Sequence, residues 1–272
     1  QSSVKKALDN GWIDVFENTG KRSGAYSANV YGVHPYMLMN YNETIRSVFT
    51  LTHELGHTMH TMLANENQPF ATASYTIFVA EVASTFNERL LLDYLLERTE
   101  DPKERIALLQ KSIDAITGTF FFQTLLADYE LQAHRLVEQG KPVTADVLTG
   151  VMREIFNAYY GDATEKDELL YHVWARIPHV FRSPFYVYQY ATCFASSAQI
   201  YNNVKNLPED QQQEAIDDYL NLLRAGGSDY PMELLKKAGV DLSQPEPVMA
   251  VINQLDTLVD QMEIEVAKLD EQ

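Results

Sequence analysis

The chain has a single cysteine, Cys193, among its 272 residues. One thiol excludes an internal disulfide and fits a reducing compartment, so we expect a cytoplasmic protein. Cys193 stands in an apolar, helix-like stretch with no second feature of cysteine chemistry. We therefore expect a buried, inert thiol rather than a nucleophile.

Basic residues are also scarce. Lys and Arg number 21 against 38 Asp and Glu, which gives a formal net charge of −17. Such a surface repels the phosphates of nucleic acids and of anionic membranes, so we expect neither as a partner. No apolar run approaches the roughly 20 residues that a membrane helix needs. The chain lacks internal repeats and long linkers as well, and we expect residues 1–272 to form one domain.

The sequence contains one strong motif for a metal site. Residues 53–57 follow the H-E-x-x-H pattern of zinc metallopeptidases, in a stretch of helical character over residues 47–65. Residues four apart share a helix face, so His53 and His57 can direct two imidazoles at one metal ion. Glu54 is placed to act as general base on a water. The alternative is a chance match, but the uncharged flanks argue against it. Gly56 weakens the helix, so we expect another chain segment to approach closely there.

A catalytic zinc needs a third protein ligand. His60 follows on the same helix, but three ligands along one straight helix cannot close on one ion, so we expect His60 to pack or to support a ligand. The metzincin pattern of a third histidine is missing. Glu81 is the better candidate, because it is an acid on the apolar side of residues 78–88, and a buried carboxylate needs a partner or a metal.

Glu88 lies two helical turns beyond Glu81 on the same face. It could be the ligand itself, but we favour a role as the acceptor that orients a ligand imidazole. Both glutamates could instead be surface residues of an acidic protein.

These segments resemble oligoendopeptidase F, of the thimet oligopeptidase family of zinc peptidases. The resemblance is carried by HELGHTMH at 53–60 and FVAEVASTFNE at 78–88, and also by SGAYS at 23–27 with HPY at 34–36, PFYVYQYAT at 184–192 and AGGSDYP at 225–231. It implies one zinc ion held by His53, His57 and Glu81, with Glu54 as the base. It also implies that the substrates are short peptides.

The same resemblance implies that a downstream histidine and tyrosine pair binds the substrate and polarises the scissile carbonyl. By position these are His179, Tyr186 and Tyr190. If the chain is helical from Pro184, the two tyrosines share a face and Tyr188 points elsewhere, although their alternation alone suggests a strand and an aromatic core is the other possibility. Further candidates for substrate contact are His34, Tyr188, Gly226 and Gly227.

The fold class that we expect is mainly α: a zincin-like, multi-helix catalytic domain with a small β element near the active-site helix. One or two short strands are expected within residues 28–40, for example at 36–39, and their edge could pair with a peptide. Expected helices cover residues 2–9, 103–117, 119–139, 146–160, 168–173, 207–223, 231–238 and 247–269.

Members of the resembled family are usually longer, and Gln1 is not an initiator methionine. We therefore expect the chain to be the C-terminal catalytic portion of a longer protein, without the N-terminal helical lobe that forms the other wall of the substrate channel. Two alternatives remain. One is a fragment that binds zinc and peptide without turnover, and the other is a zinc hydrolase of a non-peptide amide.

Overall fold

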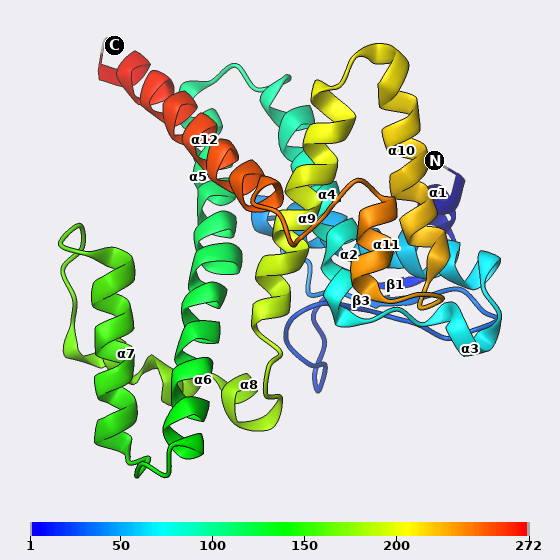
Figure 1. The fold of residues 1–272 in the computed structure, drawn as a ribbon. Helices are drawn as coiled ribbons and strands as arrows, with labels where there is room; N and C mark the ends of the chain where they lie inside the picture. The colour runs from blue at the N-terminus through cyan, green and yellow to red at the C-terminus, as the bar shows by residue number, and fades with distance from the viewer. Residues whose placement is uncertain (1, 271–272) are drawn as a thin grey trace. The chain divides into compact units, whose positions relative to one another are not determined.

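The computed structural model describes residues 2–270, so Gln1 lies outside the described residues (Figure 1). Within that range the chain is mainly helical, with one small three-stranded sheet. The predicted fold class is confirmed. Among these residues, no helix combines the length and the apolar character that crossing a bilayer requires.

The chain divides into two compact units. The first comprises the residues up to Ile113 and from Cys193 onward, and the second comprises Asp114–Thr192. Each unit has its own buried core and is described by itself. The expectation of one catalytic domain over residues 1–272 stays a prediction.

The small sheet of the first unit is formed by β1 (Ile13–Asp14), β2 (Tyr26–Ala28) and β3 (Tyr36–Leu38) in the order β1-β3-β2. β3 pairs in parallel with β1 and antiparallel with β2, so β2 is an edge strand. The expected strand at 36–39 is thus confirmed to within one residue. Ser27 of β2 shares a hydrogen bond of 2.9 Å with Thr58, which attaches the sheet to the next helix.

That helix, α2 (Ile45–Asn67), contains the H-E-x-x-H motif. It begins at Thr44, whose side chain accepts a hydrogen bond from the backbone N–H of Ser47, as expected of a helix N-cap. A short α3 (Phe70–Ala73) leads into α4 (Ile77–Leu96), which carries Glu81. Helix α1 (Ser2–Asp9) precedes the sheet.

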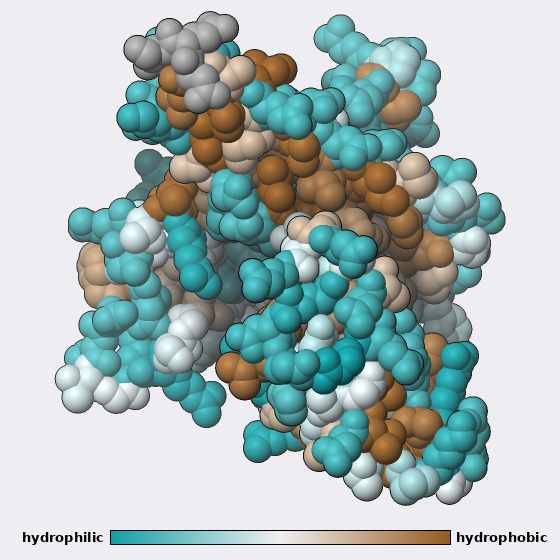
Figure 2. Space-filling view, turned by 90° about the vertical axis from the view of Figure 1, so that its left-hand side faces the viewer, coloured by the Kyte–Doolittle hydropathy of each residue, from teal (hydrophilic) through white to brown (hydrophobic). Residues whose placement is uncertain are grey.

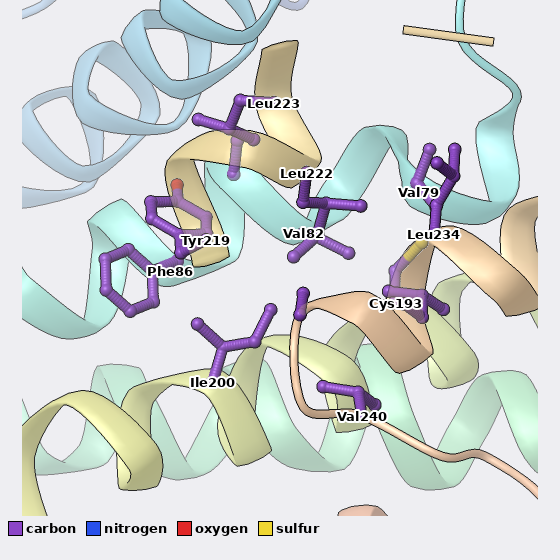
Figure 3. Packing of buried hydrophobic residues seen from close by; sticks show 13 residues of the cluster. Val79, Val82, Phe86, Cys193, Ile200, Tyr219, Leu222, Leu223, Leu234 and Val240 are labelled. Atoms are coloured by element: carbon purple, nitrogen blue, oxygen red, sulfur yellow. The ribbon is translucent and has the colours of Figure 1, made fainter. Parts of the chain in front are cut away.

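The core of the first unit lies between α4 and three later helices: α9 (Tyr188–Asn206), α10 (Glu209–Ala225) and α11 (Pro231–Lys237). In Figure 3, Val82 and Phe86 of α4 lie close to Ile200 of α9 and Tyr219 of α10. The rings of Phe86 and Tyr219 are 4.4 Å apart. This apolar packing holds α4 in place within the first unit.

The last helix, α12 (Glu246–Asp270), keeps part of its apolar face exposed. Ile264 is 57% exposed, and Val259 and Val266 are exposed as well. Figure 2 shows brown apolar side chains gathered in the upper part of the view, among teal hydrophilic ones.

The second unit is a set of helices around its own core. Its elements are η1 (Thr117–Phe121), α6 (Phe122–Glu138), α7 (Ala145–Tyr160), η2 (Glu168–Arg176) and α8 (Pro178–Arg182). Two helices cross the boundary between the units, namely α9 and α5 (Pro102–Ile116). Leu125, Met152 and Ile155 are almost completely buried in this core.

Two local expectations differ from the structure. The predicted break at Gly118 is a π-helical turn instead, so the chain stays helical from α5 into α6. Residues 184–187 are not helical, and α9 begins only at Tyr188. The reason lies in Glu130, a buried carboxylate that accepts a hydrogen bond of 2.7 Å from the N–H of Phe185 and holds that residue at a φ of 60°.

The contact between α2 and α4 is exceptionally close at Gly56. A Cβ atom at Gly56 would lie 2.6 Å from the Cα of Ser84 and 2.7 Å from the carbonyl oxygen of Ala83. The two backbones therefore touch without a side chain between them. The close approach expected from a glycine inside the motif is confirmed.

The substitution Gly56→Ala tests this contact. Alanine gains about 1 kcal/mol of helix propensity over glycine. The clash with Ser84 forces the helices apart, however, and overpacking of this kind typically costs about 1–3 kcal/mol. We expect the net effect to be a lower free energy of unfolding in urea.

Gly150→Ala is the matched control, because Gly150 lies inside α7 and a Cβ there would meet nothing within 4 Å. That variant should be as stable as the wild type or more stable. A Gly56→Ala protein that is stabilised to the same degree would show that the α2–α4 contact is not as tight as described.

Candidate metal centre

Three side chains from α2 and α4 converge on one point. The Nε2 atoms of His53 and His57 are 3.2 Å apart, and the Oε2 atom of Glu81 is 3.2 and 3.3 Å from them. Among the described residues, these three form the group of histidine and acidic side chains that could hold a metal ion. The three predicted ligands are thus brought together, half-buried, at the contact of the two helices.

The triangle of ligand atoms has the size that a small tetrahedral cation requires. With metal–ligand bonds of about 2.0 Å, as for zinc with imidazole and carboxylate, the corners of a tetrahedron lie about 3.3 Å apart. The three observed separations of 3.2, 3.2 and 3.3 Å match this value. Two imidazoles and one carboxylate also form a donor set that suits zinc. The residues present therefore fit the ion.

Glu88 supports His53 from behind. Its Oε1 atom is 2.7 Å from Nδ1 of His53, so Nδ1 donates to the carboxylate and Nε2 is left facing Glu81. Lys111 of α5 lies 3.8 Å from the other Glu88 oxygen. This geometry agrees with the orienting role expected for Glu88, and it places Glu88 outside the group of three ligand atoms.

Glu54 is buried beside this triangle, with only 6% of its surface exposed. Burial raises the pKa of its carboxyl, although the nearby His53 and His57 and a hydrogen bond from the Ser27 backbone act in the opposite direction. Its Oε2 atom has no hydrogen-bond partner in the described structure. A buried carboxylate oxygen without a partner is costly and is suited to accept a proton.

The ligand residues are strongly coupled to each other. Burial favours the neutral imidazole of His53, but hydrogen bonds to Glu81 and Glu88 outweigh it and raise the pKa of His53 to about 10. Burial alone would also raise the pKa of Glu81, yet the hydrogen bonds from His53 and His57 hold it well below its usual range. A metal ion bound here would take the place of the proton on His53.

His60 lies outside the group of three ligand residues. It is fully buried, and its ring stacks on that of Tyr75 at a centroid distance of 3.6 Å. Burial lowers the pKa of His60 to about 3, so its ring stays neutral, and neither ring nitrogen has a hydrogen-bond partner. The expectation that His60 packs rather than binds the metal is confirmed.

The predicted substrate-polarising residues gather within the second unit. The rings of His179 and Tyr186 stack at 5.1 Å, and those of Tyr186 and Tyr190 meet edge to face at 5.5 Å. The three side chains form one cluster even though the turn at 184–187 replaces the expected helix. Tyr188 is 39% exposed at the start of α9. The roles of all four stay predictions.

The remaining residues that were predicted to contact the substrate pack against other parts of the protein. His34 stacks on Trp12 and packs against Tyr36, with ring centroids 4.5 Å apart in both pairs. Gly227 donates its N–H to the carbonyl of Thr72 at 2.8 Å. A Cβ on Gly226 would lie 2.4 Å from that same oxygen. The two glycines therefore pack the end of α10 against α3, and their contact with a substrate stays a prediction.

Sequence reasoning missed two residues at this centre. Ser84 donates a hydrogen bond of 2.8 Å to Oε2 of Glu81, and Ser27 reaches Glu54 through its backbone. The first could have been found, because Ser84 follows Glu81 by three residues and so shares its helix face. The second depends on a contact between strand and helix that no local pattern encodes.

Comparison with known proteins identifies the family. Residues 2–254 match the model of Peptidase family M3. The chain belongs to this family. It is 41% identical over 262 residues to the oligopeptidase PepF of Bacillus subtilis, which covers 96% of this chain and 38% of that protein. An oligoendopeptidase F homolog of Lactococcus lactis is 40% identical, over 98% of this chain and 44% of its own length.

Solved structures of the family agree. A putative peptidase from Chlamydophila abortus superposes with a TM-score of 0.85 at 38% identity, covering 97% of this chain and 44% of that one. The oligoendopeptidase-F from Enterococcus faecium gives 0.71 at 36% identity, with 82% and 40% covered. The resemblance to oligoendopeptidase F is therefore confirmed, and this chain spans less than half the length of these M3 relatives.

The raised pKa of His53 predicts how the stability of the metal-free chain depends on pH. A group whose pKa is higher in the folded state stabilises the fold below its unfolded pKa of about 6.5, and this contribution is lost as the pH rises towards the folded value of about 10. In EDTA, the wild type should therefore exceed His53→Gln in free energy of unfolding by more at pH 6.5 than at pH 9.5.

Comparing the two proteins removes the contributions of the other groups that titrate in this range. Urea denaturation at several pH values gives the difference directly. A difference that stays constant from pH 6.5 to 9.5 would contradict a protonated His53 in the metal-free fold.

Proposed function

We propose that this chain is the zinc-binding catalytic portion of a metallopeptidase that hydrolyses short peptides. Membership of peptidase family M3 supports the reaction class. The observation that carries the proposal is the triangle of His53, His57 and Glu81 with the unpartnered Glu54 oxygen beside it. A metal-ligand set with an adjacent buried base is the arrangement that activates a water for attack on an amide.

His53, His57 and Glu81 would hold one zinc ion. When bound, the ion would supply Lewis-acid polarisation of the scissile carbonyl and make a water acidic enough to react near neutral pH. Glu88 keeps His53 in the orientation that this binding needs, through the hydrogen bond to Nδ1.

Glu54 is the proposed general base. Its free Oε2 atom accepts the proton of the attacking water and later delivers it to the amine of the leaving peptide. Burial raises the pKa of this carboxyl, which brings its basicity closer to the working pH of such an enzyme. The N–H of Ser27 holds the carboxylate in place during both transfers.

Tyr186 and Tyr190 are the proposed hydroxyl donors. Tyr190 or Tyr186 donates a hydrogen bond to the oxygen that becomes negative when the carbonyl is attacked. His179 stacks on Tyr186 and fixes its ring. For the peptide itself we propose contacts with His34, Tyr188, Gly226 and Gly227, and pairing of its backbone with the edge strand β2.

Because the chain spans less than half of its relatives, a second function also deserves a test: binding of zinc and peptide without turnover. We propose that a further lobe of the same protein completes the substrate channel. The single buried Cys193 suits a cytoplasmic location. A panel of quenched peptides and non-peptide amides, with zinc analysis, distinguishes the peptidase, the binding fragment and a hydrolase of other amides.

Glu54→Gln tests the assigned base. The amide cannot take a proton from water, so turnover of quenched peptides should fall by about 10²–10⁴-fold. Zinc content, measured by mass spectrometry of the dialysed protein, should stay at one ion per chain. His53→Ala is the control that should lose both zinc and activity. If Glu54→Gln keeps more than a tenth of the wild-type rate, another group is the base.

Tyr190→Phe tests the proposed donor. Loss of one hydrogen bond to the developing oxyanion typically lowers kcat by about 100-fold, and we expect a KM close to that of the wild type. Tyr94→Phe, an exposed tyrosine of α4 outside the site, is the control and should leave both constants unchanged. Unaltered kinetics in Tyr190→Phe would remove Tyr190 from the reaction.

A further inference from the structure

Ser84 lies one helical turn beyond Glu81 on α4 and is completely buried. Its hydroxyl is 2.8 Å from the Glu81 Oε2 atom and 3.0 Å from the Glu81 carbonyl oxygen. A hydroxyl has one proton, and a bond to a charged carboxylate is stronger than one to a neutral carbonyl. The proton of Ser84 therefore goes to the side chain of Glu81.

The Glu81 oxygen that Ser84 contacts is the same oxygen that faces the two histidines in the candidate metal centre. Oε2 of Glu81 is also the atom 3.2 Å from His53 and 3.3 Å from His57. A carboxylate oxygen accepts from more than one direction, so the same atom can bond Ser84 on one side and face the imidazoles on the other. The hydroxyl thereby fixes the rotation of the carboxylate about its last torsion.

We infer that Ser84 is a positioning residue that selects Oε2 as the single coordinating oxygen of Glu81. The inference rests on the proposed zinc site and deepens it. Glu88 orients the ligand His53 through a hydrogen bond to its Nδ1 atom, and Ser84 orients the ligand Glu81 through a hydrogen bond to its Oε2 atom. Two of the three ligands thus have their own fixed partner.

A general helix effect is the competing explanation, because buried serine and threonine hydroxyls often bond a carbonyl one turn back. The neighbouring residue, Thr85, allows the two explanations to be distinguished. Thr85 is also buried and donates to the same Glu81 carbonyl at 2.6 Å or to Ser197 at 2.8 Å, but its hydroxyl makes no hydrogen bond to the carboxylate. Thr85 is therefore a matched control within the same turn.

The experiment compares Ser84→Ala with Thr85→Val in zinc binding by the metal-free chain, measured in competition with a chromophoric chelator. Loss of such an orienting hydrogen bond typically weakens metal affinity by about 10–100-fold, which we expect for Ser84→Ala. Thr85→Val should stay close to the wild type. Circular dichroism in EDTA establishes that both variants are folded.

A second measurement follows the coordination itself. Cobalt(II) loaded in place of zinc absorbs visible light. The intensity of its absorption bands falls when a four-coordinate, tetrahedral site changes to a higher coordination number. Releasing Glu81 to bind through both oxygens should weaken these bands in Ser84→Ala and leave them unchanged in Thr85→Val. This readout is independent of the stability of the fold.

Failure of the positioning role and failure of the proposed zinc site would give different results. Wild-type zinc affinity and cobalt spectrum in Ser84→Ala would overturn the positioning role, and so would an equal loss in both variants. Failure of the proposed function itself would appear differently, because the wild type would then bind no zinc, or His53→Ala would bind it as tightly as the wild type does.

Discussion

The candidate metal centre depends on one contact, the meeting of the α2 and α4 backbones at Gly56 and Ser84. With no side chain between them, the helices lie close enough for Glu81 to reach both histidines. Val82 and Phe86 of α4 also pack into the apolar core of the first unit, which helps to hold the helix in this position. The separations of the ligand atoms are therefore set mainly by the main chain.

Charge is the second constraint. Three carboxylates, of Glu54, Glu81 and Glu88, lie within or beside the same half-buried site, and burying so much negative charge is costly unless cations or donors compensate it. Without a metal, the compensation comes from a protonated His53 and from Lys111. The site is thus arranged around a positive charge that the protein itself supplies only in part.

Much of this arrangement could be predicted from the sequence because it depends on helix periodicity. The spacing of His53 and His57, the apolar setting of Glu81 and most helix limits follow from residues three or four apart. The turn before α9 could not be predicted, because it depends on a hydrogen bond from Phe185 to Glu130, 55 residues earlier in the chain. The division into two units and the stacking of His60 on Tyr75 are likewise tertiary features.

The close contact between α2 and α4 also determines what would be needed to transfer this site into another protein. An ordinary helix pair would not offer the two histidines and the glutamates the same close approach, because side chains at the crossing usually keep helix axes about 8–10 Å apart. The minimal motif to transfer is the pair of helices together with the glycine that allows their backbones to touch. For protein design, an apparently empty position such as Gly56 is as much a part of the site as the atoms that bind.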